Sequence, residues 1–342
     1  MVNVVVTGGG GFLGARLARR LLAAGELDLA GGGMRPIDRL TLIDQVPAPA
    51  DLAADYRVAA VQGDLGQLLA AGPRPRTGPG PTAEPSPLAG SDLIFHLAAA
   101  VSGECEADFD LGLRANLRAT EALLAAGRAL GTRPVLVFSS SLAVFGNPPD
   151  HPLPAVVDDQ TLASPQSSYG TQKLIGEYLL ADYTRKGFLR GRAMRLATVS
   201  VRPGRPNAAA SGFLSGIIRE PLAGQRAVCP VDAQTEVALA SPDRAVDALL
   251  RAATAADQDW GGTSAVNMPS LAITVGDMVA ALERAAGPAA TALIDWVPDP
   301  AVARLVTSWP ARFRTDRAAR LGLAPDPDFD AVIATYLAQT SA

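Results

Sequence analysis

Along residues 1–201, short runs of aliphatic and β-branched residues alternate with stretches in which apolar residues recur every three or four positions. The short runs predict strands at 2–7, 39–44, 57–65, 92–99, 134–141 and 191–201. The periodic stretches predict helices at 13–24, 112–130 and 166–186. Strands and helices that alternate in this way predict right-handed crossovers and a parallel α/β sheet covered on both faces.

The pattern changes after residue 201, where the alternation weakens and proline-bounded pieces predict a smaller lobe. We expect residues 1–201 to form the large domain, and 243–268 to return to it as one more helix and strand. The remaining parts, 202–242 and 269–342, then form the smaller, substrate-binding lobe. Residues 73–90 carry six prolines and little that can pack, which predicts a mobile surface insertion.

Composition narrows the class of protein. The 342 residues are 48% hydrophobic and 19% charged, as in a globular protein with a substantial core. The net charge of −4 and the pI near 5.3 argue against a nucleic-acid or membrane surface, which leaves a small molecule as the expected partner. Two cysteines cannot form a disulfide framework, and no secretion signal or spanning segment is evident, so we expect a cytoplasmic protein.

The two histidines stand far apart without metal-ligand spacing, which predicts no metal site, and His96 is expected to be a packed core residue.

A glycine-rich turn, "TGGGGFLG" at residues 7–14, separates the first strand from the first helix. Glycines there let backbone amides and the helix N-terminus approach a diphosphate, so the turn predicts a Rossmann-type dinucleotide site. Asp44 ends the second strand, where an acid accepts hydrogen bonds from the adenosine ribose and repels a 2′-phosphate, which favours NAD over NADP. Its distance along the chain from Gly14 exceeds the usual ~20 residues, and residues 26–38 are interpreted as a lengthened loop. Asp64, after the next strand, is a candidate for the adenine edge.

Lys173 is one of only two lysines in a chain with 28 arginines, and Tyr169 lies four residues before it on the same predicted helix face. An ammonium beside a phenol favours the phenolate and brings a tyrosine toward the working range of a general base. Ser164 and Pro165 predict the start of this helix. Three serines, residues 139–141, end a predicted strand at the sheet edge where α/β enzymes bind ligands. Each feature alone has a structural explanation, a surface helix pair or a strand-ending turn, but their conjunction favours a catalytic site.

With these motifs the sequence resembles the extended short-chain dehydrogenases/reductases, the NAD-dependent epimerase/dehydratase superfamily. The resemblance implies that Ser141, Tyr169 and Lys173 are catalytic, with Phe145 at a position where the family usually has tyrosine. It also matches "HLAA" at 96–99 and places the family's usual asparagine at Asn116. The implied NAD-binding residues are Gly8, Gly11, Phe12, Leu13, Gly14, Asp44, Asp64, Leu65, Leu97, Ala98, Ala99, Asn116, Ser139, Tyr169, Lys173 and Thr198.

Other positions indicate which branch of the family is closest. Leu142 and Ala143 stand where dehydratases carry an Asp-Glu pair, which argues against dehydration. Residues 235–250 lack the basic-aromatic lead that nucleotide-sugar epimerases use for the nucleotide. Residues 96–110, 195–207, 215–222 and 308–323 instead resemble a branch that oxidises short sugar acids of the D-erythronate type. That resemblance implies oxidation of the 2-hydroxyl to a 2-oxo acid by hydride transfer to NAD.

Such a substrate requires a cation for its carboxylate. Arg202 is the first candidate, and Arg219 and Arg312 are weaker ones, for which a surface ion pair is the favoured alternative. Ser102 either lies beside the substrate or is a buried turn serine. In the expected reaction, Tyr169 as phenolate takes the proton of the substrate hydroxyl while Ser141 hydrogen-bonds the same oxygen.

Two other functions stay open from the sequence. One is a nucleotide-sugar epimerase with tightly bound NAD, and the other is a non-catalytic NAD(H)-binding protein of the same fold. The resemblance also implies a homodimer, formed through the helices that carry Asn116 and Tyr169.

Overall fold

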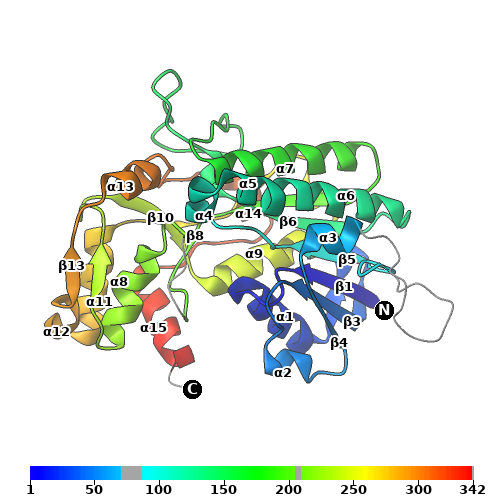
Figure 1. Ribbon diagram of the computed structural model, residues 1–342, viewed down its shortest axis with the longest axis horizontal. Helices are drawn as coiled ribbons and strands as arrows, with labels where there is room; N and C mark the ends of the chain where they lie inside the picture. Colours follow the sequence, from blue (N-terminus) through cyan, green and yellow to red (C-terminus); the bar gives the residue numbers. More distant parts are fainter. Residues whose placement is uncertain (71–85, 205–208, 341–342) are drawn as a thin grey trace.

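The centre of the large domain is an eight-stranded sheet with the order β11-β7-β6-β5-β1-β3-β2, in which β4 also pairs with β3 (Figure 1). The computed structural model describes residues 1–70, 86–204 and 209–340. All neighbouring strands of this sheet pair in parallel except β2 and β3. The predicted fold class, a doubly wound Rossmann-type α/β sheet, is therefore confirmed. The strands are β1 (Val2–Thr7), β2 (Glu26–Asp28), β3 (Met34–Asp44), β4 (Val58–Gln62), β5 (Leu93–His96), β6 (Val135–Ser141), β7 (Arg190–Leu196) and β11 (Val266–Asn267).

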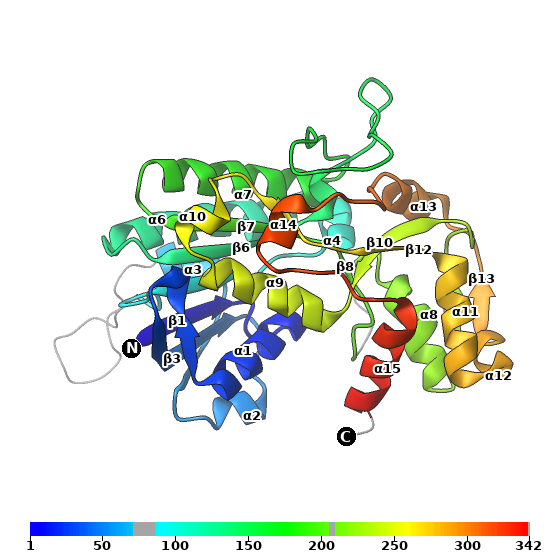
Figure 2. The same cartoon turned by 180° about the vertical axis from the view of Figure 1, so that it is seen from behind.

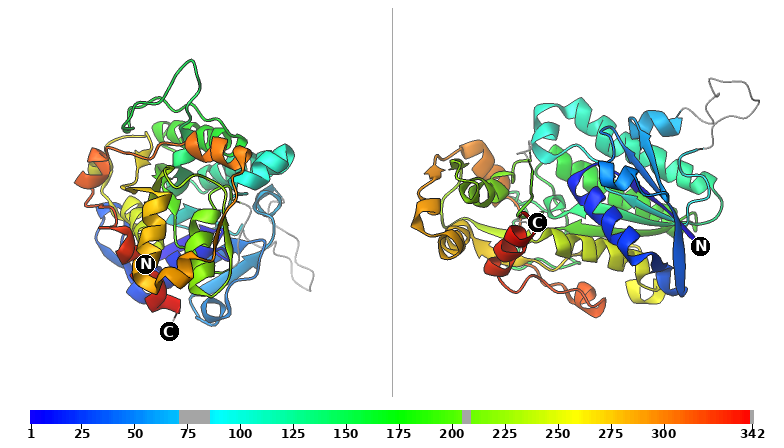
Figure 3. Two further views of the ribbon diagram at one scale, coloured as in Figure 1. Left: turned by 90° about the vertical axis from the view of Figure 1, so that its left-hand side faces the viewer. Right: turned by 90° about the horizontal axis from the view of Figure 1, so that it is seen from below.

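Helices cover both faces of this sheet (Figures 1 and 3). On one face lie α1 (Phe12–Ala24) and α9 (Pro242–Thr254), and on the other α3 (Leu65–Ala70), α6 (Ala119–Ala129) and α7 (Ser168–Arg185). Because successive strand side chains point to opposite faces, Val4 joins the core under α1 and Val5 joins the core under α6. Short helices α2 (Ala50–Ala53), α10 (Asp257–Trp260) and η1 (Leu29–Gly31) lie in the connections.

The segment 26–38, which we interpreted as a loop, is instead a β-hairpin. β2 pairs antiparallel with the first residues of β3, with Leu27 opposite Arg35. Gly31 and Gly33, with φ of 70° and 91°, allow the chain to reverse between the two strands. The hairpin accounts for the long separation between the glycine turn and Asp44.

Two of the predicted helices differ from the observed ones in their bounds or their regularity. The predicted helix 112–130 consists of a π-helical turn, η2 (Leu113–Arg118), followed by α6. Two short helices, α4 (Ser102–Ala107) and α5 (Phe109–Gly112), precede it. The predicted start of α7 at Ser164 was wrong, because α7 begins at Ser168 and the hydroxyl of Ser167 caps it by accepting from Gly170 N at 3.0 Å. Between β6 and α7, η3 (Leu142–Val144) follows the strand directly.

The smaller lobe has its own sheets and its own core. Strands β8 (Thr198–Val199), β10 (Glu236–Ala240) and β12 (Leu271–Thr274) form one sheet, and β9 (Ala227–Cys229) and β13 (Ile294–Trp296) form another. Around them lie α8 (Phe213–Leu222), α11 (Val275–Ala286), α12 (Pro288–Thr291), α13 (Pro300–Thr307) and α15 (Phe329–Thr340). Buried Ile217, Met278 and Ile333 join α8, α11 and α15 into one apolar cluster, and the three helices lie near one another in Figure 2.

The chain crosses between the two parts more often than the sequence predicted. α9 and β11 pack with the large sheet, and α14 (Asp316–Arg320) also lies against it, with Ala318 and Leu321 in the core of the large domain (Figure 2). Part of the predicted lobe 269–342 therefore belongs to the large domain by its contacts. Of the predicted insertion 73–90, residues 73–85 lie outside the described residues, and its last part is packed, since Leu88 is fully buried.

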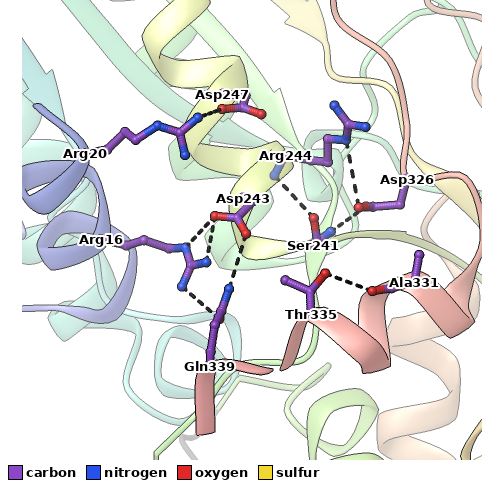
Figure 4. Close-up of polar contacts among 10 residues, drawn as sticks. All are labelled: Arg16, Arg20, Ser241, Asp243, Arg244, Asp247, Asp326, Ala331, Thr335 and Gln339. Atoms are coloured by element: carbon purple, nitrogen blue, oxygen red, sulfur yellow. Dashed lines mark hydrogen bonds and ion pairs between the residues drawn. The ribbon is translucent and has the colours of Figure 1, made fainter. Parts of the chain in front are cut away.

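A polar cluster joins the lobe to the helix that follows the glycine turn (Figure 4). Arg16 of α1 pairs with Asp243 of α9, with Nη2 and Oδ1 2.6 Å apart. Gln339 of α15 accepts from Arg16 at 3.1 Å and donates to Asp243 at 3.3 Å. Asp326, just before α15, accepts from the backbone N–H of Ser241 at 2.7 Å. Partly exposed ion pairs of this kind contribute about 0–1 kcal/mol each, so we assign the cluster chiefly a role in fixing how α15 sits on α1 and α9.

Candidate active site

A cleft of about 670 Å³ lies at the carboxyl ends of β1, β5 and β6 and reaches the first residues of the smaller lobe. This is the sheet edge at which ligands bind in open α/β folds. Almost all of the predicted site residues line it. They are Gly8, Gly11, Phe12, Leu13, Gly14, Asp44, Asp64, Leu65, Leu97, Ala98, Ala99, Ser102, Ser139, Tyr169, Lys173, Thr198 and Arg202.

The glycine turn leaves no room for side chains where the backbone folds on itself. A Cβ on Gly14 would lie 2.0 Å from the carbonyl oxygen of Gly8, and one on Gly8 would lie 2.7 Å from Ala98 N. Gly8 also has a φ of 75°. At the start of α1, Gly11 is the N-cap residue and no side chain caps the helix, so the first amides of the helix face the cleft. This backbone fits an anionic diphosphate.

Asp44 lies in the cleft at the end of β3, as predicted, but its carboxylate also holds the glycine turn. Its Oδ2 accepts from Gly10 N at 3.0 Å and Gly11 N at 3.1 Å, and its Oδ1 accepts from Val46 N at 3.2 Å. Each carboxylate oxygen has two lone pairs, so Oδ1 keeps acceptor capacity for a ribose hydroxyl. The same residue thus orders the turn and offers a negative charge to the adenosine end of the cleft.

Asp64 stands beside Asp44 at that end of the cleft. Its Oδ2 accepts from Gln45 Nε2 at 3.2 Å, and its Oδ1 accepts from Gln67 N at 2.9 Å. Gln45 and Val46 also line the cleft, although sequence reasoning did not select them. They could have been predicted as cleft residues from the sequence because they directly follow Asp44, which was already a candidate.

Tyr169 and Ser141 meet as predicted, but the expected ionisation of the phenol is not found. The Ser141 hydroxyl hydrogen-bonds the Tyr169 phenol and lowers its pKa, as does the charge of Arg202. Burial is the larger effect and raises the pKa of Tyr169 to about 12. Lys173 Nζ lies 5.7 Å from the centroid of the tyrosine ring. Ser141 does not itself line the cleft and reaches it through Tyr169.

Lys173 sits in a space that suits a compact ammonium. The side chain is 3% exposed, and its Nζ donates to the carbonyl oxygen of Ser139 at 2.8 Å. The ring of Phe138 lies against it, with the centroid 4.8 Å from Nζ. Burial lowers the pKa of Lys173 to about 8. A planar guanidinium is larger and spreads its charge over a fork of donors, so we expect it to fit the contact with Phe138 and the end of β6 less well than an ammonium does.

A chain of hydrogen bonds fixes the strand ends below the cleft. His96 of β5 is 1% exposed, with its Nδ1 2.7 Å from the hydroxyl of Thr7 and its Nε2 2.9 Å from the hydroxyl of Thr120. Burial lowers the pKa of His96 to about 3, so the imidazole is neutral. Ser139 adds a bond from its hydroxyl to the carbonyl oxygen of His96 at 2.9 Å. The prediction of a packed, hydrogen-bonded His96 is confirmed.

Asn116, which was predicted to contact NAD, lies behind the wall of the cleft and is not among the residues that line it. Its Oδ1 accepts from Ala100 N at 2.7 Å, and its Nδ2 donates to Gln172 Oε1 at 2.8 Å. The side chain is 4% exposed on the π-helical turn η2. Asn116 therefore supports the loop that carries Ser102 into the cleft, where Ser102 Oγ accepts from Ala210 N at 3.1 Å.

The three candidate arginines have different surroundings. Arg219 donates to the carbonyl oxygen of Arg202 at 2.7 Å and pairs with Glu220, and exposed Arg312 pairs with Glu236. Only Arg202 lines the cleft, and among the described residues its guanidinium has no ion-pair partner. Burial lowers the pKa of Arg202, and the neighbouring Arg219 lowers it further. An anionic ligand would relieve both effects.

Several cleft residues come from segments that carried no recognisable motif. Two of them, Ala209 and Ser211, precede α8 in the smaller lobe, and three others lie on or near the helices after β5. Except for the carboxylate of Glu104, their small or apolar side chains gave no chemical signal in the sequence. The residues concerned are Ala209, Ser211, Glu104, Leu111 and Ala115.

Across residues 1–70, 86–204 and 209–340, no three His, Cys, Asp or Glu side chains are grouped so that they could hold a metal ion. Within the same ranges, no helix combines the length and apolar character needed to span a membrane.

Comparison with known proteins identifies the family. The model of the NAD dependent epimerase/dehydratase family matches residues 83–267. The chain belongs to this family. The predicted resemblance is thereby confirmed, and NAD is the cofactor for which the glycine turn, the uncapped start of α1 and Asp44 are arranged.

Relatives in the epimerase/dehydratase family include proteins that match nearly the whole chain. A D-erythronate dehydrogenase of Cupriavidus necator is 48% identical over 336 residues, which are 98% of each chain. The D-erythronate dehydrogenase of Haemophilus influenzae is 38% identical and covers 98% of this chain and 99% of its own. The crystal structure of a nucleoside-diphosphate-sugar epimerase from Agrobacterium tumefaciens is 39% identical, with a TM-score of 0.84 over 98% of this chain and 94% of that chain.

The environment of Lys173 makes a prediction about cofactor binding. We expect Lys173→Arg to weaken NADH binding at least about tenfold, because the guanidinium fits less well between Phe138 and the end of β6. Lys186→Arg, which changes the other, exposed lysine, is the matched control and should leave the dissociation constant unchanged. NADH fluorescence titration measures both. Equal affinities in the two variants would contradict this explanation of why residue 173 is lysine.

Proposed function

We propose that this protein is an NAD-dependent dehydrogenase that oxidises the 2-hydroxyl of a short sugar acid, such as D-erythronate, to the 2-oxo acid. The observation that carries the proposal is the position of Arg202, a cation in the cleft beside Tyr169 that has no counter-charge among the described residues. A carboxylate next to the reacting carbon would be held by this guanidinium through charge-assisted hydrogen bonds. The two D-erythronate dehydrogenases that match the full chain support the same substrate class.

In this proposal each residue of the cleft has a separate role in binding or in proton transfer. Arg202 holds the carboxylate, and Ser141 and Tyr169 hydrogen-bond the 2-hydroxyl. Tyr169 takes the hydroxyl proton, and the effects that favour its ionised form are the Ser141 hydroxyl and the charge of Arg202. Because burial raises the pKa of Tyr169 to about 12, we expect oxidation to become faster as the pH rises and more of the phenol loses its proton.

The cofactor's place follows from the other half of the cleft. The glycine turn and the start of α1 would hold the diphosphate, Asp44 the adenosine ribose, and Lys173 the nicotinamide ribose. NAD, when bound, supplies the acceptor for the hydride.

A nucleotide-sugar epimerase is the second candidate function. It is favoured by the similarity to the Agrobacterium nucleoside-diphosphate-sugar epimerase, which is 39% identical to this chain. In an epimerase the cofactor is reduced and reoxidised within one turnover, so NADH does not accumulate. Net NADH formation therefore separates the two candidates.

The proposal is tested by assaying purified protein with NAD and a panel of four-carbon sugar acids. We expect NADH absorbance to grow in proportion to the oxidised acid, with one stereoisomer strongly preferred. Absence of NADH with every acid in the panel, together with interconversion of a nucleotide sugar, would favour the epimerase instead.

The role of Arg202 gives a more specific prediction. We expect Arg202→Met to raise the KM for the sugar acid about 10- to 100-fold, because loss of a charge-assisted pair to a carboxylate costs about 1.5–3 kcal/mol. NADH affinity should stay unchanged. The matched control is Arg312→Met, which removes an exposed arginine outside the cleft. A KM that responds equally to both changes, or to neither, would refute the assignment.

Two further parts of the proposal concern assembly and location. We propose a homodimer formed through the helices η2, α6 and α7; on α7, Tyr178 is 62% exposed. The molar mass in solution tests this. A cytoplasmic location is consistent with the two cysteines, both of which are free and buried.

A further inference from the structure

Three residues of α7, spaced four apart, each contact one of the three serines that end β6. The Tyr169 phenol meets the Ser141 hydroxyl, and Lys173 Nζ donates to the backbone carbonyl of Ser139. One turn further along α7, Glu177 Oε1 accepts from the hydroxyl of Ser140 at 2.5 Å. The first two contacts involve the predicted catalytic residues, whereas the third has no role in the function proposed so far.

The third contact belongs to a buried ion pair. Glu177 is 5% exposed and binds Arg195 of β7 through two bonds, to Nε at 2.9 Å and to Nη2 at 2.7 Å. Arg195 is 9% exposed, and its Cζ lies 4.8 Å from the centroid of the Phe145 ring. Glu177 therefore connects α7 to two neighbouring strands, to β6 through Ser140 and to β7 through Arg195.

Stability alone does not account for this arrangement. Removing two charges from water costs several kcal/mol per ion, and well-packed apolar residues often replace a buried pair without loss of stability. A carboxylate that accepts hydrogen bonds from two different strands does, however, fix one position of the helix along the sheet, whereas apolar contacts allow several similar positions. The position of α7 along β6 determines where Ser141 and Lys173 lie relative to each other.

We propose that Glu177 is a positioning residue of this enzyme: through Ser140 and Arg195 it holds the carboxyl end of β6 against α7 and so places Ser141 and Lys173 for the reaction. The expected effect of Glu177 on the rate of the reaction rests on the proposed dehydrogenase function. Its expected effect on the pKa and the NMR signal of Lys173 does not rest on that function.

The charge of Glu177 also acts on Lys173. The groups that face the Lys173 amine are Cys105 of α4, His96 of β5, and Tyr169 and Glu177 of α7. Burial lowers the pKa of Lys173 to about 8, while the Cys105 thiol and the Glu177 carboxylate oppose the shift. His96 is buried and neutral, and burial raises the pKa of the Cys105 thiol to about 11, so Glu177 is the carboxylate among these groups.

The kinetic test uses Ser140→Ala, which removes the bond between Glu177 and β6 and leaves the ion pair intact. We expect kcat to fall about tenfold or more, because small misplacements of reacting groups are costly, while the KM values for NAD and for the sugar acid change less than about twofold. The control is Ser91→Ala, which removes another buried serine hydroxyl, bonded to the carbonyl oxygen of Leu88 at 2.8 Å. It should lower the unfolding temperature similarly and leave kcat unchanged.

The spectroscopic test uses the Lys186→Arg chain, in which Lys173 is the only lysine. With lysine labelled at Cε, one NMR signal then reports the pKa of Lys173, which we expect near 8. Glu177→Gln combined with Arg195→Gln removes both charges together, so no buried charge is left unpaired. Of the two charges, the Glu177 carboxylate is the one that acts on the Lys173 amine, where it favours the ammonium, so this change should lower the pKa of Lys173 further. In the Ser140→Ala chain the Lys173 signal should shift in position, since the end of β6 moves.

The outcomes separate the inference from the function on which it rests. If the unmodified chain forms no NADH from sugar acids, the proposed function fails, and the Lys173 signal alone decides the inference. A Lys173 signal and pKa that do not respond to either change would overturn it. So would a Ser140→Ala variant that loses stability like Ser91→Ala but keeps its kcat, because the contact would then be merely structural.

Discussion

The close contact between the end of β6 and the start of α7 is the constraint on which the rest of the site depends. A Cβ on Gly170 would lie 2.0 Å from the carbonyl oxygen of Ala143, and one on Gly176 would lie 2.8 Å from the ring of Phe138. The helix can therefore approach the strand only because these two positions are glycine. This approach brings Tyr169 and Lys173 to the sheet edge at which the glycine turn also ends.

The same contact determines the protonation of the site. Close packing removes water from both side chains, and burial favours the neutral form of each. The pKa of Tyr169 accordingly rises to about 12 and that of Lys173 falls to about 8. The groups that oppose these shifts are Ser141 and Arg202 for the phenol and Cys105 and Glu177 for the amine, and they stand on four different segments of the chain. Catalysis by this cleft thus depends on charges that the fold brings together around a desolvated pair.

Much of this architecture could be predicted from the sequence, because its signals are local. The strand, glycine turn and helix at residues 2–24 and the pair Tyr169 and Lys173 need only neighbouring residues to be recognised. The hairpin at 26–36 was missed because its strand is short and glycines interrupt its pattern. The helix cap was placed at Ser164 because a serine before proline is a common start, whereas the actual cap, Ser167, lacks that proline.

What the sequence could not provide were the effects of distant segments on one another. The return of α14 to the large domain and the position of Asn116 behind the cleft depend on tertiary packing. The pKa of Tyr169 was expected to fall because its charged neighbour was known and its burial was not. The four-residue spacing of Tyr169, Lys173 and Glu177 was present in the sequence. Its role could be recognised only when the structure placed the three serines of β6 in contact with these side chains.

The central claim is that the buried phenol of Tyr169 handles the substrate proton in an NAD-binding cleft. The most direct measurement compares Tyr169→Phe with the unmodified chain, by NADH titration and by the rate of NADH formation from the sugar acid that the unmodified chain prefers. The account predicts an NADH dissociation constant within about twofold and a kcat lowered at least about 100-fold, as for loss of a general base. A variant that binds NADH equally well and forms it at the unmodified rate would contradict the account and leave a cofactor-binding fold without this chemistry.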